Sequence, residues 1–269
     1  MHRVFRGLTR SAAIFLFVLS LLAVTVCAED VAIDISAVDT HNIVVIQYKP
    51  KLTADVKVTV EKGGEKYVYT IKDNNPVTLP LQMGNGAYSI RVLENIGGAK
   101  YRPVAGDTVN VTVFDENKVY TNSIQIIHFN SGMTSIKDLS ALSDKGKNTN
   151  EKIDIIYRFI IGNIEYDYDL VKNLPKDYVP VIDVVYARRK GICYGYASLF
   201  ASALRSFGVP AKLQMGYCAE LKEYHAWNEI LIDGKWVKVD TTYDAAYQKA
   251  KLSFSMVKDN KKYSVVRQY

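Results

Sequence analysis

The sequence predicts an α+β protein in which a small all-β part precedes a mixed part. Up to about residue 113, short runs rich in β-branched and aromatic residues alternate with turn signals, which is typical of strands. From about residue 135, apolar residues recur at helical spacing. Two alternating runs then meet at Asp233-Gly234, the strongest short signal for a β-hairpin.

The first 28 residues have the features of a secretory signal peptide. Three arginines in the first ten positions precede an apolar run from Ala12 to Val26, and Val26–Ala28 resembles a cleavage site. The run is short for an uncleaved anchor and is followed by the acidic pair Glu29–Asp30. Lipid attachment at Cys27 is disfavoured because Val26 stands where that pattern needs a small residue. We therefore expect cleavage and a secreted or extracytoplasmic protein at the cell surface.

Composition and charge exclude several functional classes. The chain has 34 Lys and Arg against 28 Asp and Glu, a formal charge of +6. Removing the three arginines of the signal leaves a net charge of +3, which gives no reason to expect nucleic acid. No later stretch reaches membrane-spanning length. The four His of the whole chain and the two Cys that remain after cleavage form no metal-ligand spacing, so we expect neither a metal nor a cofactor.

Residues 29–115 are expected to form a small β-sandwich of the immunoglobulin or fibronectin kind. Five runs are typical of its strands: Asn42–Tyr48, Val56–Val60, Lys66–Ile71, Ala87–Leu93 and Thr108–Val113. Glycine and asparagine turn signals separate them. This half contains no cluster of ionisable residues that suggests chemistry, so a spacer or carbohydrate-contacting role is expected.

Residues 116–269 are expected to form a second domain, which begins with helices. Ser135–Lys145 has apolar residues at helical spacing and is followed by Gly146. Asn148 and Glu151 resemble an N-terminal helix cap, and behind them an apolar stripe over Ile153–Ile164 predicts an amphipathic helix. The segment from Glu165 to Arg189 is expected to be looser.

Cys193 is the strongest candidate for a reactive side chain. It directly precedes an apolar helical face that ends before Gly208, so it lies at a helix N-terminus. There the free backbone N–H groups and the positive end of the helix dipole favour a thiolate. The alternative is a buried cysteine that packs as a small hydrophobic residue, which is the commoner case.

The hairpin at Asp233-Gly234 predicts that His225 and Asp240 meet. A two-residue turn sets Ile232 opposite Lys235, so His225 and Asp240 become diagonal neighbours on one face, with Cα atoms ~7–8 Å apart. In such an arrangement Cys193 would attack an acyl carbon, His225 would act as base and then acid, and Asp240 would fix the imidazole tautomer. The alternative is a packing histidine and an exposed strand end.

Several motifs resemble those of the transglutaminase-like superfamily. They are Gly191–Phe200 (GICYGYASLF), Leu204–Ala211 (LRSFGVPA), His225–Glu229 (HAWNE), Gly234–Thr242 (GKWVKVDTT) and, ahead of the nucleophile motif, Asn163–Tyr168 (NIEYDY). The resemblance covers mainly residues 150–245. It implies a papain-like α+β transglutaminase core with Cys193 on the helix and with His225 and Asp240 on the sheet. It also implies that residues 116–269 form a catalytic domain performing acyl transfer through a thioester.

The resemblance leaves the reaction open between a transferase that ends on an amine and a hydrolase that ends on water. Protein glutamine and cell-wall peptide are both candidate acyl donors, so the expected partner is a protein or peptide substrate. The alternative function is a non-catalytic surface binding or adhesion module that retains the fold.

Four further side chains and the second cysteine complete the expectations for the site. The Cys193 N–H is the first candidate oxyanion donor, and Tyr166 and Tyr168 either line the cleft or donate as well. Trp227 and Trp236 are expected in the core or cleft wall. Cys193 and Cys218 are expected to be free thiols, because a bridged Cys193 cannot attack; the alternative is a redox-gated enzyme.

Overall fold

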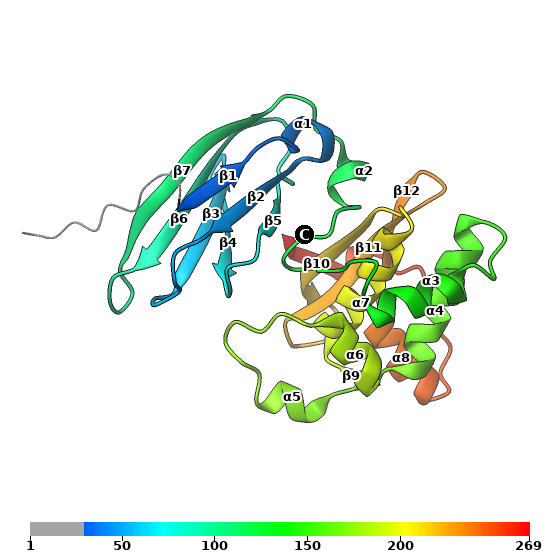
Figure 1. Ribbon diagram of the computed structural model, residues 1–269. Coiled ribbons are helices and arrows are strands. Elements are labelled where there is room, and N and C mark those ends of the chain that lie inside the picture. The colour runs from blue at the N-terminus through cyan, green and yellow to red at the C-terminus, as the bar shows by residue number, and fades with distance from the viewer. Residues whose placement is uncertain (1–29) are drawn as a thin grey trace, which may run out of the picture.

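The structure of the chain is a computed structural model that describes residues 30–269 (Figure 1). The predicted signal peptide, with Cys27, lies outside the described residues. Strands fill the first half, and helices gather around a second group of strands, so the protein is α+β as predicted. No helix within residues 30–269 is long and apolar enough to cross a membrane.

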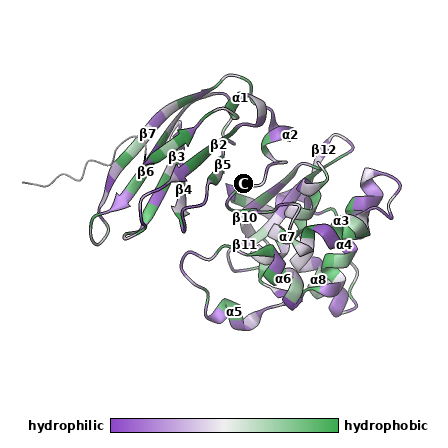
Figure 2. Ribbon diagram, in the orientation of Figure 1, coloured by the Kyte–Doolittle hydropathy of each residue, from purple (hydrophilic) through white to green (hydrophobic). Residues whose placement is uncertain are grey.

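Two antiparallel sheets occupy the first half. One has the order β1-β2-β5 and the other β4-β3-β6-β7. Their bounds are β1 Val31–Asp34, β2 Ile43–Tyr48, β3 Val56–Lys62, β4 Glu65–Ile71, β5 Val77–Pro80, β6 Gly86–Asn95 and β7 Tyr101–Val111, with the short α1 Val38–His41 between β1 and β2. Buried residues from both sheets, such as Val44 and Ile90, form one hydrophobic cluster. The alternation that creates it appears as changing colour along the strands in Figure 2.

Three strands of this half differ from the prediction, which did not include the short β1. The last strand starts at Tyr101, whereas the sequence predicted a start at Thr108. The short β5 was not predicted, since Pro80 weakens the strand signal; β5 lies at a sheet edge, where proline is tolerated.

Helices dominate the next segment. They are α2 Glu116–Val119, α3 Thr134–Ser143, α4 Thr149–Asn163, α5 Tyr168–Lys172, α6 Ile182–Arg188, α7 Cys193–Ser206 and α8 Thr241–Lys249. The predicted cap is present, since Asn148 Oδ1 accepts a hydrogen bond from the Glu151 N–H at 2.9 Å. The segment expected to be loose contains α5 and α6, which were too short to leave a periodic pattern. It also contains β8 Glu165–Tyr166, which pairs with β9 Lys190–Gly191.

The second half contains a four-stranded antiparallel sheet of order β12-β11-β10-β13. Its strands are β10 Ala211–Cys218, β11 His225–Ile232, β12 Lys235–Val239 and β13 Tyr263–Gln268. Ile232 pairs with Lys235, so the predicted hairpin register is confirmed. Both turn residues have positive φ, 49° at Asp233 and 73° at Gly234, as a tight two-residue hairpin requires.

Helix α7 is the centre of the second core. It is buried along nearly its whole length and packs against β11 and against the surrounding helices. The two halves meet near the C-terminal strand, which lies between them in Figure 1. There the ring of Tyr269 meets Tyr67 edge-on at 5.5 Å between centroids, and Gln125 Nε2 donates to Thr70 O at 2.7 Å.

Candidate active site

Cys193 is the first residue of α7, as the sequence predicted. The preceding Ile192 has an extended conformation and makes no side-chain cap, so no side chain occupies the amide groups at this helix start. Two flanking glycines allow α6 to pack closely here. A Cβ added at Gly191 or Gly195 would lie 3.2 Å from a methyl group of Val185. The glycines on both sides of Cys193 therefore let the start of α7 pack closely against α6. The Cys193 side chain remains partly exposed.

His225 and Asp240 form a buried pair. His225 Nε2 lies 2.8 Å from Asp240 Oδ2, and their side chains are 6% and 0% exposed. His225 is the first residue of β11. Asp240 follows β12 directly, where the sequence predicted it as the last residue of the strand. The register of the hairpin thus brings together the two side chains that the sequence paired.

Asp240 accepts two further hydrogen bonds. Its Oδ1 accepts from the Tyr243 N–H at 3.0 Å, so the same side chain caps α8. Its Oδ2 also accepts from the Tyr263 hydroxyl at 3.1 Å. Sequence reasoning missed Tyr263, because it lies beyond the motifs and nothing in the sequence distinguishes it among nineteen tyrosines. The carboxylate is held by donors from β11, α8 and β13.

His225 is strongly basic in this setting. Burial alone would lower its pKa, but hydrogen bonds to Asp240 and to Cys193 outweigh burial and raise the pKa to about 10. His225 therefore carries a proton at neutral pH. Because Asp240 engages Nε2, the remaining ring nitrogen Nδ1 is the one available to Cys193. The imidazolium thus contacts the buried carboxylate and lies near Cys193.

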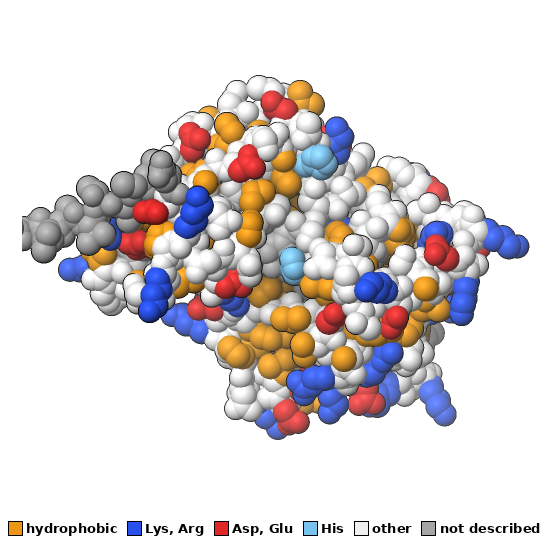
Figure 3. Space-filling model, viewed as in Figure 1, with side chains coloured by type: hydrophobic (Ala, Val, Ile, Leu, Met, Phe, Trp, Pro, Cys, Tyr) orange, Lys and Arg blue, Asp and Glu red, His pale blue; other side chains and the backbone are white. Residues whose placement is uncertain are grey.

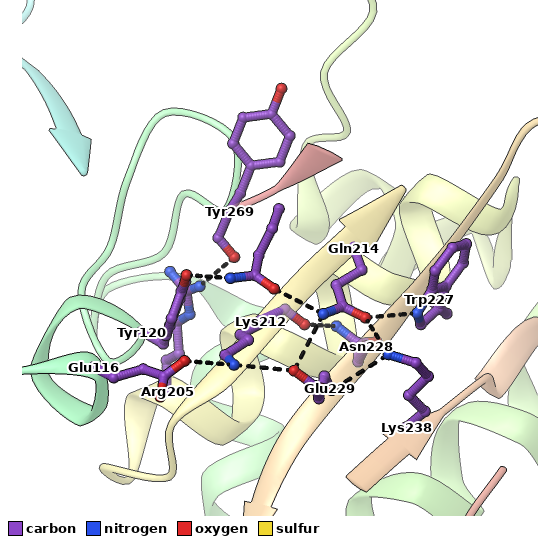
Figure 4. Close-up of polar contacts among 11 residues, drawn as sticks. Glu116, Tyr120, Arg205, Lys212, Gln214, Trp227, Asn228, Glu229, Lys238 and Tyr269 are labelled. Carbon is purple, nitrogen blue, oxygen red and sulfur yellow. Dashed lines mark hydrogen bonds and ion pairs between the residues drawn. The ribbon is translucent and has the colours of Figure 1, made fainter. Parts of the chain in front are cut away.

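Figure 4 shows a buried polar network, and the strand register assigns His225 to the same face of the sheet. Lys212 Nζ contacts Glu229 at 3.0 Å and Glu116 at 2.7 Å, and Lys238 Nζ contacts Glu229 at 3.3 Å. Burial would raise the pKa of Glu229, but the two lysines hold it below its ordinary value. Paired in this way, the charges can remain buried.

Both tryptophans lie beside this network, Trp227 fully buried and Trp236 half-buried. Trp227 donates from Nε1 to Gln214 Oε1 at 2.8 Å, and its ring stacks on His225 at 6.2 Å between centroids. Trp236 lies 3.8 Å below the Lys212 ammonium. Trp227 therefore connects the histidine to the network through a fixed ring.

An exposed apolar surface borders the nucleophile. Tyr166 pairs with Gly191 across the β8–β9 strands. Burial, and after it the proximity of Cys193, raises the pKa of Tyr166 to about 12. Tyr168 packs on Tyr166 at 5.0 Å and is 70% exposed. Hydrophobic side chains gather on the lower part of the face in Figure 3, where α5 and α6 lie in Figure 1. The exposed ones on this segment include Tyr168, Val171, Leu174, Val181 and Val184.

Cys218 has a different setting. It ends β10, is 3% exposed and packs with Trp227 and Tyr263. Its Sγ lies 3.1 Å from Glu220 Oε2, and burial raises the pKa of the thiol. Cys193 and Cys218 are both free. Within residues 30–269, no group of three or more His, Cys, Asp or Glu is placed to hold a metal ion.

Part of the chain is similar to known proteins. The family model of the transglutaminase-like superfamily matches residues 139–241. Kyphoscoliosis peptidase of Mus musculus is 27% identical over 123 residues, which are 42% of this chain and 18% of that protein. The Homo sapiens protein of the same name is 24% identical over 146 residues, 51% of this chain and 21% of that protein. The chain thus spans about a fifth of the length of the curated relatives it matches.

Solved structures with a similar arrangement include the periplasmic domain of TgpA from Pseudomonas aeruginosa. It is 17% identical, covers 77% of this chain and 70% of its own, and has a TM-score of 0.40. The family match contains Cys193, His225 and Asp240, whereas Tyr263 lies beyond it. Residues 139–241 of this chain therefore form a domain of the transglutaminase-like superfamily.

Proposed function

We propose that the protein is a cysteine-dependent enzyme that transfers the acyl group of a protein or peptide amide through a thioester. Cys193 is the nucleophile, His225 the general acid and base, and Asp240 the group that orients the imidazole. One observation carries this proposal: the buried His225–Asp240 pair, joined at 2.8 Å, lies close enough to Cys193 for the cysteine to affect the pKa of the histidine. A binding module needs no such pair.

The first half-reaction forms the thioester. Cys193 and protonated His225 act as a thiolate–imidazolium pair, in which the sulfur attacks the amide carbon and a tetrahedral oxyanion forms. His225 then gives its proton to the amide nitrogen, the carbon–nitrogen bond breaks, and an amine or ammonia leaves. Asp240 keeps the imidazole oriented and stabilises its positive charge before the proton is transferred.

The second half-reaction releases the acyl group. Neutral His225 takes a proton from water or from a primary amine as that molecule attacks the thioester. The carbon–sulfur bond breaks and the thiolate–imidazolium pair is restored. Water gives an acid and an amine gives a new amide, so hydrolase and transferase share every residue of the site.

Two groups are candidate donors to the oxyanion. The Cys193 backbone N–H lies at the start of α7, where the helix leaves its amides unpaired. The Tyr166 hydroxyl is the second candidate because its ring lies beside Cys193.

The surface over α5 and α6 supports a polypeptide substrate, since contiguous exposed apolar patches commonly mark interaction sites. On the basis of the signal-like first 28 residues, we further propose that the enzyme acts outside the cytoplasm on secreted or cell-surface protein or peptide.

Three assays run in parallel test the proposal. The protein is incubated with casein and a fluorescent primary amine, and amine incorporation, ammonia release and peptide cleavage are measured. Dependence of any product on Cys193 supports the enzyme, and the product identifies the reaction. Cys218→Ala is the matched control, since it removes the other thiol. Products that persist in Cys193→Ala would contradict the proposed nucleophile, and absence of all products over a broad substrate panel would favour the binding module.

A further inference from the structure

The hydroxyl of Tyr263 shares an acceptor atom with His225. It lies 3.1 Å from Asp240 Oδ2, the oxygen that also accepts from His225 Nε2 at 2.8 Å. Tyr263 begins β13, outside the segment that the family model matches. A residue beyond that segment therefore contacts the carboxylate of the proposed site.

The tyrosine is held firmly in this place. Its ring packs on Trp227 at 4.9 Å between centroids, and its backbone pairs with Cys218 of β10. An exposed ion pair, Lys262 with Glu220, lies next to the start of the strand. At the bulge of β10, a Cβ on Gly216 would lie 2.0 Å from Ser264 O, so glycine is what allows β13 to approach. The hydroxyl therefore reaches Asp240 from a fixed strand.

The hydroxyl acts as a donor to the carboxylate. Burial and the charge of Asp240 raise the pKa of Tyr263 far above its ordinary value, so it keeps its proton. Its other polar neighbour is Cys218, whose own thiol lies 3.1 Å from Glu220 Oε2 and can donate there. The Tyr263 proton is therefore free to point at Asp240.

We propose that Tyr263 is a positioning residue that limits how strongly Asp240 holds the proton of His225. A donor on Oδ2 withdraws part of the carboxylate charge that the imidazolium would otherwise receive. An imidazolium held less tightly is a better general acid towards the leaving amine. The proposal rests on the proposed function only for its effect on rate; its effect on the proton of His225 stands by itself.

Other charged and titratable groups around the pair remain when the hydroxyl is removed. Cys193 of α7 faces His225, and Cys218 of β10 faces Tyr263. The carboxylate of Asp244 on α8 repels that of Asp240, but Asp244 forms an ion pair with Lys258. A change of Tyr263 to phenylalanine leaves all of these in place and deletes one donor.

Histidine NMR tests the proposal directly. The ring carbon signals of His225 are followed from pH 6 to 11 in the full chain, and the signal is assigned by its loss in His225→Gln. Tyr263→Phe should move the titration midpoint of His225 to higher pH. With a substrate established by the three assays above, its kcat should fall roughly three- to tenfold with KM little changed.

Two controls separate this effect from general damage. Tyr243→Phe deletes a hydroxyl that contacts Tyr247 on the same helix, while its backbone N–H still reaches Asp240, so it should leave the titration unchanged. Tyr263→Phe combined with Asp240→Asn should titrate as Asp240→Asn alone, because the effect acts through the carboxylate. A midpoint in Tyr263→Phe that stays or moves to lower pH overturns the proposal, and because this readout needs no substrate, it does so whatever the three assays show.

Discussion

The start of α7 and the end of β10 each present a free cysteine, and the two thiols differ in almost every physical respect. Cys193 is partly exposed, begins a helix and lies near a protonated histidine. Cys218 is buried, ends a strand and has a carboxylate as its neighbour. A positive neighbour favours the charged form of a thiol, whereas burial beside a carboxylate favours the neutral form.

The comparison indicates that the reactivity expected of each cysteine depends on its position in the fold. Cys218 lies within the same group of side chains as Asp240, since Tyr263 touches both. It lacks the helix end and the imidazolium, which are the features that activate a nucleophile. Four measurements can break or sharpen this contrast.

The largest expected effect is on catalysis. Cys193→Ala should reduce the rate by up to about 10⁶-fold, because covalent catalysis is lost as a unit. Cys218→Ala should keep most of the activity. The rate of amide conversion is measured for both variants, with circular dichroism to show that each is folded. Comparable losses in the two variants would break the contrast.

The next largest effect is expected from changing Asp240, which is proposed to orient the histidine beside Cys193 and has no such role for Cys218. Asp240→Asn should lower kcat by about 10⁴-fold, because an amide can leave His225 in the wrong tautomer. Asparagine is also a good N-cap, so α8 should persist. Single-turnover rates and helix content by circular dichroism are the measurements. A loss of helix together with the rate would assign the effect to folding instead.

Alkylation compares the thiols without any substrate. At pH 7, iodoacetamide should modify Cys193 at least roughly a hundredfold faster than Cys218, since only the former is partly exposed and lies near a protonated histidine. Peptide mapping by mass spectrometry over time gives both rates. After unfolding without reductant, both sites should alkylate, as expected of free thiols. Faster labelling of Cys218 in the native protein would reverse the comparison.

The smallest expected effect is on the free energy of unfolding. His225, in the site around Cys193, should make this free energy depend on pH. The pKa of His225 is raised to about 10 in the folded protein, above the ordinary unfolded value of about 6.5. Its stabilising contribution is therefore complete below about pH 6.5 and declines as the pH rises towards 10. Urea unfolding at pH 6.5, 8 and 9.5 should show a falling free energy of unfolding in the parent.

The control for that trend is His225→Gln, which should flatten it. Cys218 contributes later, because its pKa is raised by burial from a value that is already alkaline. An equal slope in the parent and in His225→Gln between pH 6.5 and 8 would contradict the prediction.

Local signals predicted much of this fold. Asp233-Gly234 set the hairpin register, because a two-residue turn leaves one pairing that keeps the apolar face inside. The position of Cys193 followed from the apolar helical face behind it, and Asn148 capped α4 as its spacing predicted. These features depend on residues that are near one another in the sequence.

What the sequence did not reveal depends on distant contacts. The pairing of β13 with β10 requires Gly216 and a bulge, and neither leaves a periodic pattern. Tyr263 becomes distinctive only when that pairing places it beside Asp240. Lys212, Glu229 and Lys238 resemble the solvent face of ordinary alternating strands, yet they are mutually paired on a covered face. Side-chain partners of this kind are chosen by tertiary structure.

The hydrogen bonds of Asp240 also imply an order in which the parts of the site come together during synthesis. Asp240 accepts hydrogen bonds from His225, Tyr243 and Tyr263, and the last two of these residues follow Asp240 in the chain. During synthesis the domain is extended from the N-terminus, so the thiol of Cys193 is made well before the strand that completes its support. A growing chain therefore carries an unsupported thiol, and the full arrangement forms only when β13 has docked. We therefore expect the proposed activity to appear only after the strand that begins at Tyr263 has been synthesised and has docked.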